Sequence, residues 1–153
     1  TRRQRQMCIR DRYFTRIIDE KFPDFDSVIP NDNDKNLTVD KKDLLSAVKR
    51  VSIFSNKSTH QIALSLNGDQ ITISTEDPEQ STKAKEVVVG NYTGENITVG
   101  YNAAYLKDVL SHIGSDKITV QLKSPISAAL FIPTVQEENQ NLTMLLMPIR
   151  LNE

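Results

Sequence analysis

The sequence contains no tryptophan, one cysteine, two histidines and only five glycines among its 153 residues. Because Cys8 stands alone, an internal disulfide framework is excluded, and the chain fits a reducing compartment. No apolar run approaches the length that crosses a bilayer, and no hydrophobic segment follows the basic residues 1–12 as it does in a signal peptide. These absences predict a cytoplasmic protein without membrane contact.

Motifs of catalysis are also missing. The sequence has no glycine-rich phosphate loop, no serine nucleophile elbow and no Cys–His pair in a plausible site. His112 has no second His, Cys or carboxylate at a metal-ligand spacing, and His60 is the only other histidine. Glu137 and Glu138 are paired acids in an apparent turn, without the partner residues that a hydrolase needs. We therefore expect a binding or scaffold module with no cofactor and no metal, rather than an enzyme.

Five Asn-x-Ser/Thr triplets keep one alternative open. They begin at Asn36, Asn56, Asn91, Asn96 and Asn141. In a secreted protein such triplets accept glycans. The alternative hypothesis is therefore a secreted or surface β-rich binding module. Detection of glycans on the mature protein would support this alternative.

The charge is divided unevenly along the chain. Residues 1–12 carry five arginines and one aspartate, whereas residues 13–153 carry 14 basic and 19 acidic side chains. A basic arm can bind nucleic acid. However, no periodicity or cap joins residues 1–12 to the rest of the chain, which favours a non-native or disordered segment.

Hydrophobic periodicity predicts two helices and a predominance of strands. Apolar residues at helical spacing indicate helices over 41–53 and 103–113, begun by the N-caps Asp40 and Asn102. Alternating or β-branched runs indicate strands at 13–18, 37–39, 60–66, 70–74, 83–89, 97–101, 118–122, 128–132 and 142–149. Asn67-Gly68 marks a hairpin turn. After the break at Pro30 this order is typical of an α+β domain, with two helices packed on one side of an antiparallel sheet of about eight strands.

The first helix has two unusual surface features. Lys42, Lys49 and Arg50 gather on its polar face with no acid among them, which indicates contact with a polyanion. Ile53 and Phe54 are apolar residues at its end, the first on the polar side. They indicate either local packing or a subunit contact.

Seven short motifs occur in the order and at the spacing found in one family. The motifs are Ile17-Ile18-Asp19-x-Lys21-Phe22-Pro23-Asp24-Phe25, Val28-Ile29-Pro30, Leu37-Thr38-Val39, Ile53-Phe54-Ser55-Asn56, Asp77-Pro78-Glu79-Gln80, Gly100-Tyr101-Asn102-Ala103-Ala104-Tyr105-Leu106 and Leu146-Met147-Pro148-Ile149-Arg150-Leu151. With these motifs the chain resembles the bacterial DNA polymerase III sliding clamp (beta subunit), over about residues 13–153.

The resemblance implies a C-terminal fragment of a three-domain subunit. Residues 31–153 match the third clamp domain and residues 13–30 the end of the second. In the family, two subunits join head to tail into a ring around double-stranded DNA, independently of its sequence. The ring tethers the replicative polymerase to its template and does no chemistry itself.

The resemblance also implies three sites. Lys42, Lys49 and Arg50 match the face that looks at DNA. Ile53 and Phe54, with strand 83–89 as the paired edge, match the subunit interface.

The third site is a pocket for linear peptides from the polymerase, the clamp loader and repair proteins. The first part of strand 142–149, up to about Leu146, is expected to complete the sheet. Pro148 is expected to turn the residues that follow out of the hydrogen-bond ladder. Ser27 departs from the family, where a basic residue is often found. The matching pocket residues are Pro23, Val28, Leu145, Leu146, Met147, Pro148, Ile149, Arg150 and Leu151.

Overall fold

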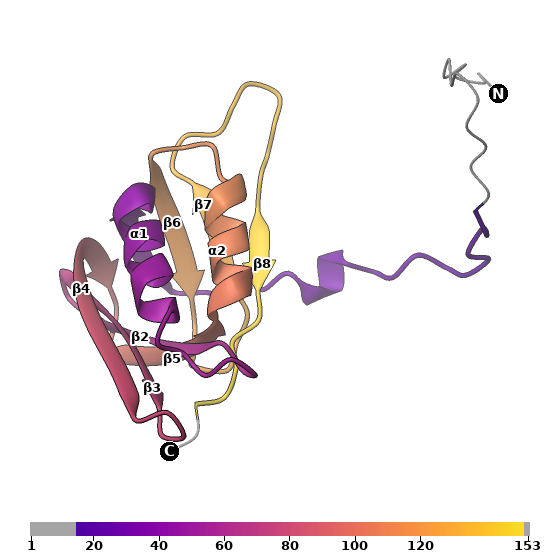
Figure 1. The fold of residues 1–153 in the computed structure, drawn as a ribbon. Helices are drawn as coiled ribbons and strands as arrows, with labels where there is room; N and C mark the ends of the chain where they lie inside the picture. Colours follow the sequence, from indigo (N-terminus) through magenta and orange to yellow (C-terminus); the bar gives the residue numbers. More distant parts are fainter. Residues whose placement is uncertain (1–14, 152–153) are drawn as a thin grey trace, which may run out of the picture.

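The computed structural model describes residues 15–151. Residues 15–28 are exposed and run away from a folded domain that occupies the rest of the described chain (Figure 1). The predicted strand over 13–18 is wrong in its described part, because residues 15–18 form no strand and Ile17 is 85% exposed. A β-branched run becomes a strand only where a neighbour accepts its backbone hydrogen bonds and buries its side chains. Residues 1–14, with Cys8 and the basic segment, and residues 152–153 lie outside the described part.

The described residues contain two α-helices and eight strands, which form the domain, and one short 3₁₀ helix in the segment before it. This 3₁₀ helix, η1, lies between Pro23 and Pro30. Both α-helices and all eight strands after Pro30 confirm the predicted order. The elements are η1 (Asp26–Val28), β1 (Lys35–Asp40), α1 (Lys41–Ser52), β2 (Gln61–Asn67), β3 (Gln70–Asp77), β4 (Thr82–Thr93), β5 (Ile97–Asn102), α2 (Ala103–His112), β6 (Lys117–Leu122), β7 (Ala129–Pro133) and β8 (Met144–Leu146).

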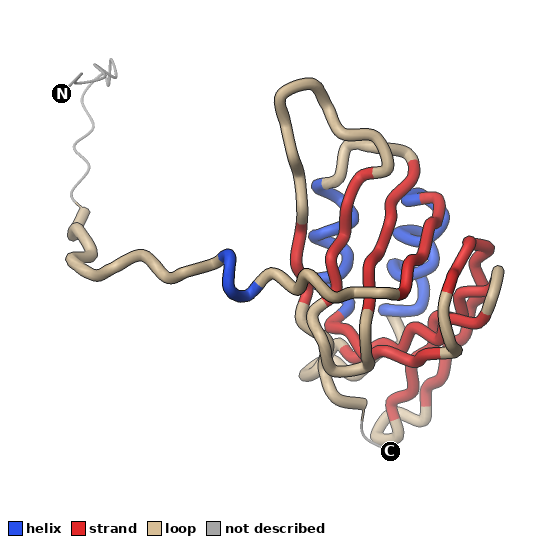
Figure 2. The backbone as a smooth tube through the Cα atoms, turned by 180° about the vertical axis from the view of Figure 1, so that it is seen from behind, coloured by secondary structure: helices blue, strands red, loops and turns tan. Residues whose placement is uncertain are grey.

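All eight strands join one antiparallel sheet in the order β5-β2-β3-β4-β1-β6-β7-β8. Helices α1 and α2 pack against each other and lie side by side on one face of this sheet (Figure 1). Seen from behind, the strands lie in front of both helices, so the opposite face carries no helix (Figure 2). This arrangement confirms the predicted α+β class.

Side-chain caps start both helices, as the sequence predicted. Asp40 accepts hydrogen bonds from the backbone N–H of Lys42 at 2.9 Å and of Asp43 at 3.3 Å. Asn102 accepts one from Ala104 N–H at 2.9 Å. Each cap satisfies donors that the first helical turn leaves free. The buried stripe consists of Leu44, Ala47, Val48 and Val51 in α1, and of Ala103, Leu106 and Leu110 in α2.

Strand β4 is longer than predicted because it serves two neighbours. Its residues 82–89 pair with β3, and its residues 90–93 pair with β1. Gly90 stands at the change of partner, where an added Cβ would lie 2.7 Å from Ile71 Cδ1 and 3.2 Å from the Thr38 carbonyl oxygen. A larger residue would have to displace the end of the Ile71 side chain and press on the Thr38 carbonyl, so glycine fits this position without rearrangement.

Among residues 15–151, the core between helices and sheet contains one unpaired hydroxyl. Tyr101 packs edge-on against Phe131, with ring centroids 6.3 Å apart. Its hydroxyl is buried without a hydrogen-bond partner, and burial raises the pKa of this phenol far above its usual value. Tyr101 also lines a cavity of about 10 Å³ whose other walls are apolar side chains.

Candidate functional site

The C-terminal tail, residues 147–151, begins where the last strand stops. Strand β8 pairs with β7 over only three residues, ending at Leu146 opposite Ala129. This end confirms the expectation that the ladder stops at about Leu146, ahead of Pro148, which has no N–H to donate, whereas the strand starts at Met144 and not at residue 142. Leu146 is buried, whereas Met147 is 58% exposed. The tail thus leaves the sheet with apolar side chains that remain accessible.

Beyond Pro148 the tail reaches the opposite edge of the sheet. Ile149 forms an isolated antiparallel bridge with Gly100 of β5, and Ile149 N–H donates to the Gly100 carbonyl oxygen at 2.8 Å. Strands β5 and β8 are the two outermost strands, so this bridge connects both edges. The sequence reasoning missed this contact, since pairing across such a separation leaves no local pattern. The glycine within the β-rich run of β5 was the available signal.

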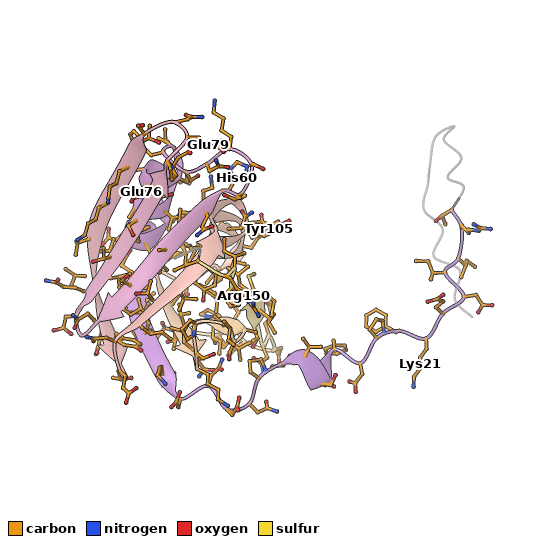
Figure 3. The ribbon with its side chains drawn as sticks, turned by 90° about the horizontal axis from the view of Figure 1, so that it is seen from below. Lys21, His60, Glu76, Glu79, Tyr105 and Arg150 are labelled. Carbon is orange, nitrogen blue, oxygen red and sulfur yellow. The ribbon has the colours of Figure 1, made fainter. Side chains whose placement is uncertain are left out.

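The predicted pocket residues fall into two groups. Leu145 to Leu151 are contiguous on the domain, and Figure 3 shows Arg150 on its surface. Pro23 and Val28 are exposed in the segment that leaves the domain, where Figure 3 labels Lys21. The structure therefore assembles the C-terminal group but does not bring Pro23 to it.

The cationic face of α1 is partly neutralised. The Arg50 guanidinium donates to both carboxylate oxygens of Glu86, with Nε 3.0 Å from Oε2. This pairing lowers the pKa of Glu86 and raises that of Arg50. Lys42 Nζ lies 3.8 Å from an Asp116 carboxylate oxygen. Lys49 is exposed and has no ion pair within the described residues.

The end of α1 exposes two apolar side chains beside an open strand edge. Ile53 is 76% exposed, and Phe54 is also exposed. The Thr82 hydroxyl donates to the Phe54 carbonyl oxygen at 3.2 Å, which connects the two elements. Along 82–89, β4 pairs with β3 on one side and with no strand of residues 15–151 on the other. Val87 and Val89 are also exposed, but they alternate with Glu86 and Val88, which face α1, and therefore lie on the opposite face of β4.

Two polar side chains considered in the sequence, His112 and Glu137, lie around one hollow of the surface. The ring Nδ1 of His112 lies 2.8 Å from the Asp108 carbonyl oxygen, one turn earlier in α2. His112 and Glu137 both line an open hollow of about 610 Å³ between α2 and the loop 134–143. Residues 15–151 contain no group of three His, Cys, Asp or Glu that could bind a metal ion. Within the same range no helix is long and apolar enough to span a membrane.

Residues 26–150 match the family model described as DNA polymerase III beta subunit, C-terminal domain. The chain is 34% identical over 139 residues to the beta sliding clamp of Pseudomonas aeruginosa, covering 91% of this chain and 37% of that relative. It is 33% identical over 137 residues to the beta sliding clamp of Caulobacter vibrioides, covering 90% of this chain and 36% of the relative. The chain therefore spans a little over a third of the length of the curated relatives that it matches.

Solved structures of sliding clamps have the same fold over most of the chain. The Caulobacter crescentus beta sliding clamp aligns with a TM-score of 0.82 at 34% identity, covering 88% of this chain and 35% of that one. A P. aeruginosa sliding clamp bound to griselimycin aligns with a TM-score of 0.80 at 34% identity, covering 87% of this chain and 35% of the other.

Proposed function

Because the chain belongs to the DNA polymerase III beta subunit family, in its C-terminal domain, we propose that it is the third domain of a DNA sliding clamp. Residues 31–153 are that domain, and residues 13–30 end the second one. The intact subunit forms a head-to-tail ring around duplex DNA and tethers the replicative polymerase without catalysing a reaction. Family membership favours this function over the secreted β-rich binding module.

The observation that carries the proposal is the C-terminal tail. Residues 147–151 lie outside the sheet ladder, yet Ile149 holds them against β5. The exposed Met147 thioether and the half-buried Pro148 and Ile149 then form an apolar surface that an extended peptide can cover. A flexible, polarisable Met suits a surface that accepts several partners. Pro23 and Val28 join it when the segment 15–30 is held by the second domain.

Griselimycin is the ligand to test against this surface, because a P. aeruginosa relative with the same fold has been solved bound to it. We infer that griselimycin also binds this chain, at the exposed apolar side chains of the tail.

The proposed contact with DNA depends on α1. Lys49 carries a charge with no ion-pair partner among the described residues, on the exposed helix face, and Lys42 is only loosely paired. Arg50 contributes less, since Glu86 holds its guanidinium. A few cations that meet phosphates without reading bases allow a ring to slide.

The proposed subunit interface combines the open edge of β4 with the exposed Ile53 and Phe54 at the end of α1. An edge strand of the partner subunit can add to residues 82–89, so that backbone hydrogen bonds and apolar burial act together. Antiparallel addition at this edge would extend the sheet across the ring.

The experiment replaces the C-terminal 37% of the P. aeruginosa clamp, the part that this chain matches, with this chain. The chimera is loaded on circular DNA, half of which is then linearised, and retention is measured by gel filtration. We expect retention on circles and loss from linear DNA, as for the unaltered P. aeruginosa clamp, the control. Equal retention on both forms, or on neither, would contradict the proposal.

A further inference from the structure

Gly100 is buried at a position where the strand pattern calls for exposure. In β5 the side chains of Ile97, Val99 and Tyr101 point into the core, and Thr98 between them is exposed. Side chains alternate along a strand, so residue 100 shares the outward face with Thr98. Gly100 is nevertheless buried, because the C-terminal tail covers it.

The tail approaches Gly100 more closely than any side chain would permit. A Cβ at residue 100 would lie 2.6 Å from the Ile149 carbonyl oxygen, 2.7 Å from Leu151 Cδ2 and 2.9 Å from Leu151 Cγ. The Leu151 side chain can rotate, but the Ile149 oxygen belongs to the backbone. An alanine at residue 100 therefore has room only if the tail backbone moves away.

Strand β5 cannot make that room by retreating. On its other edge Gly100 pairs with Ala63 of β2. Close by along the chain, Ala103 N–H donates to the His60 carbonyl oxygen at 2.8 Å, and the Asn102 side chain caps α2. The pairing with β2 and these hydrogen bonds fix the position of β5, so an added methyl group at residue 100 displaces the tail.

We propose that Gly100 is a positioning residue for partner binding. By lacking a side chain it lets Ile149 and Leu151 dock on β5, and this docking holds Met147 and Pro148 in the arrangement that a partner peptide contacts. The inference rests on the proposed function of the tail as a peptide-binding surface. It adds that the surface depends on both edge strands, since residue 146 is held by β7 and residue 149 by β5.

The test compares Gly100→Ala with Gly114→Ala in this chain. Gly114 is the matched control, because the nearest atom to an added Cβ there is Glu137 Oε1 at 3.9 Å, an ordinary contact. Amide hydrogen exchange of Ile149 without ligand reports docking of the tail, and titration with griselimycin reports the binding surface. Leu151→Ala loosens the tail while leaving β5 intact, and it replaces Gly100→Ala should that variant not fold.

In Gly100→Ala we expect faster exchange at Ile149 and weaker griselimycin binding, each by about tenfold or more. Exchange within β2 and β3 stays as in the unaltered chain, which separates displacement of the tail from general loosening. Gly114→Ala behaves as the unaltered chain in both measurements. Unchanged Ile149 exchange in Gly100→Ala overturns the inference about Gly100. Failure of the unaltered chain to bind griselimycin overturns instead the proposed function of the tail.

Discussion

The unpaired hydroxyl of Tyr101 predicts a substitution that stabilises the domain. Tyr101→Phe removes a hydroxyl that is buried and has no hydrogen-bond partner, and it keeps the ring that packs edge-on against Phe131. On folding, the tyrosine hydroxyl gives up its hydrogen bond to water and forms no new one, whereas phenylalanine has no hydroxyl to desolvate. The variant should therefore unfold at a higher temperature.

The expected magnitude depends on the cost of an unsatisfied buried group. That cost is about 1–3 kcal/mol. The cavity of about 10 Å³ beside the ring can hold one water at most, and its remaining walls are apolar. A water there would have Tyr101 as its single polar partner, too few to offset the cost. We expect Tyr101→Phe to stabilise the chain by about 1 kcal/mol, which raises the unfolding temperature by roughly 2–4 °C.

Tyr92→Phe is the matched control, with the opposite expected sign. Tyr92 is also buried, but its hydroxyl donates to the Glu95 carbonyl oxygen at 2.6 Å. Losing that bond should destabilise the chain by about 0.5–1.5 kcal/mol. Urea unfolding followed by circular dichroism measures both variants. If Tyr101→Phe destabilised the chain as much as Tyr92→Phe, the hydroxyl would have a partner and the reasoning would be refuted.

Four further substitutions test the proposed surfaces. Glu86→Gln frees the Arg50 guanidinium, so the affinity for duplex DNA, measured by fluorescence anisotropy, should rise at low salt. Lys49→Ala should reduce the slope of log affinity against log salt concentration by about 0.9, and an unchanged slope would exclude a phosphate contact at Lys49. Met147→Ala should weaken griselimycin binding in calorimetry and leave the unfolding midpoint unchanged, because the side chain is exposed; equal affinities would count against the tail. Ile53→Asp should leave the chain folded and prevent dimerisation of the chimeric clamp in gel filtration, and a persistent dimer would place the interface elsewhere.

Local chemistry made much of this fold predictable from the sequence. Asp40 and Asn102 begin their helices because a cap acts on N–H groups two or three residues away. The β2–β3 hairpin is also local, since Asn67 pairs with Gln70 and Gly68 takes a φ of +55° at the turn.

Contacts between distant segments were not predictable in the same way. The extension of β4 beyond residue 89 depends on β1, which lies far earlier in the chain, and Gly90 alone hinted at it. The Glu86 carboxylate neutralises the Arg50 guanidinium on the expected cationic face. The sequence of α1 alone cannot predict this pairing, because Glu86 belongs to strand β4. The bridge from Ile149 to Gly100 joins the two edges of the sheet and has no periodic signature.

We propose residues 145–151 as the partner-binding surface of a clamp domain. Amide chemical shifts of this chain, recorded during a titration with griselimycin, locate the bound ligand residue by residue. We predict that the changes concentrate at Leu145–Leu151 and at Gly100, with little change in α1. Saturable binding that shifts other amides and leaves the tail unaffected, or no shift at any concentration, would contradict the claim.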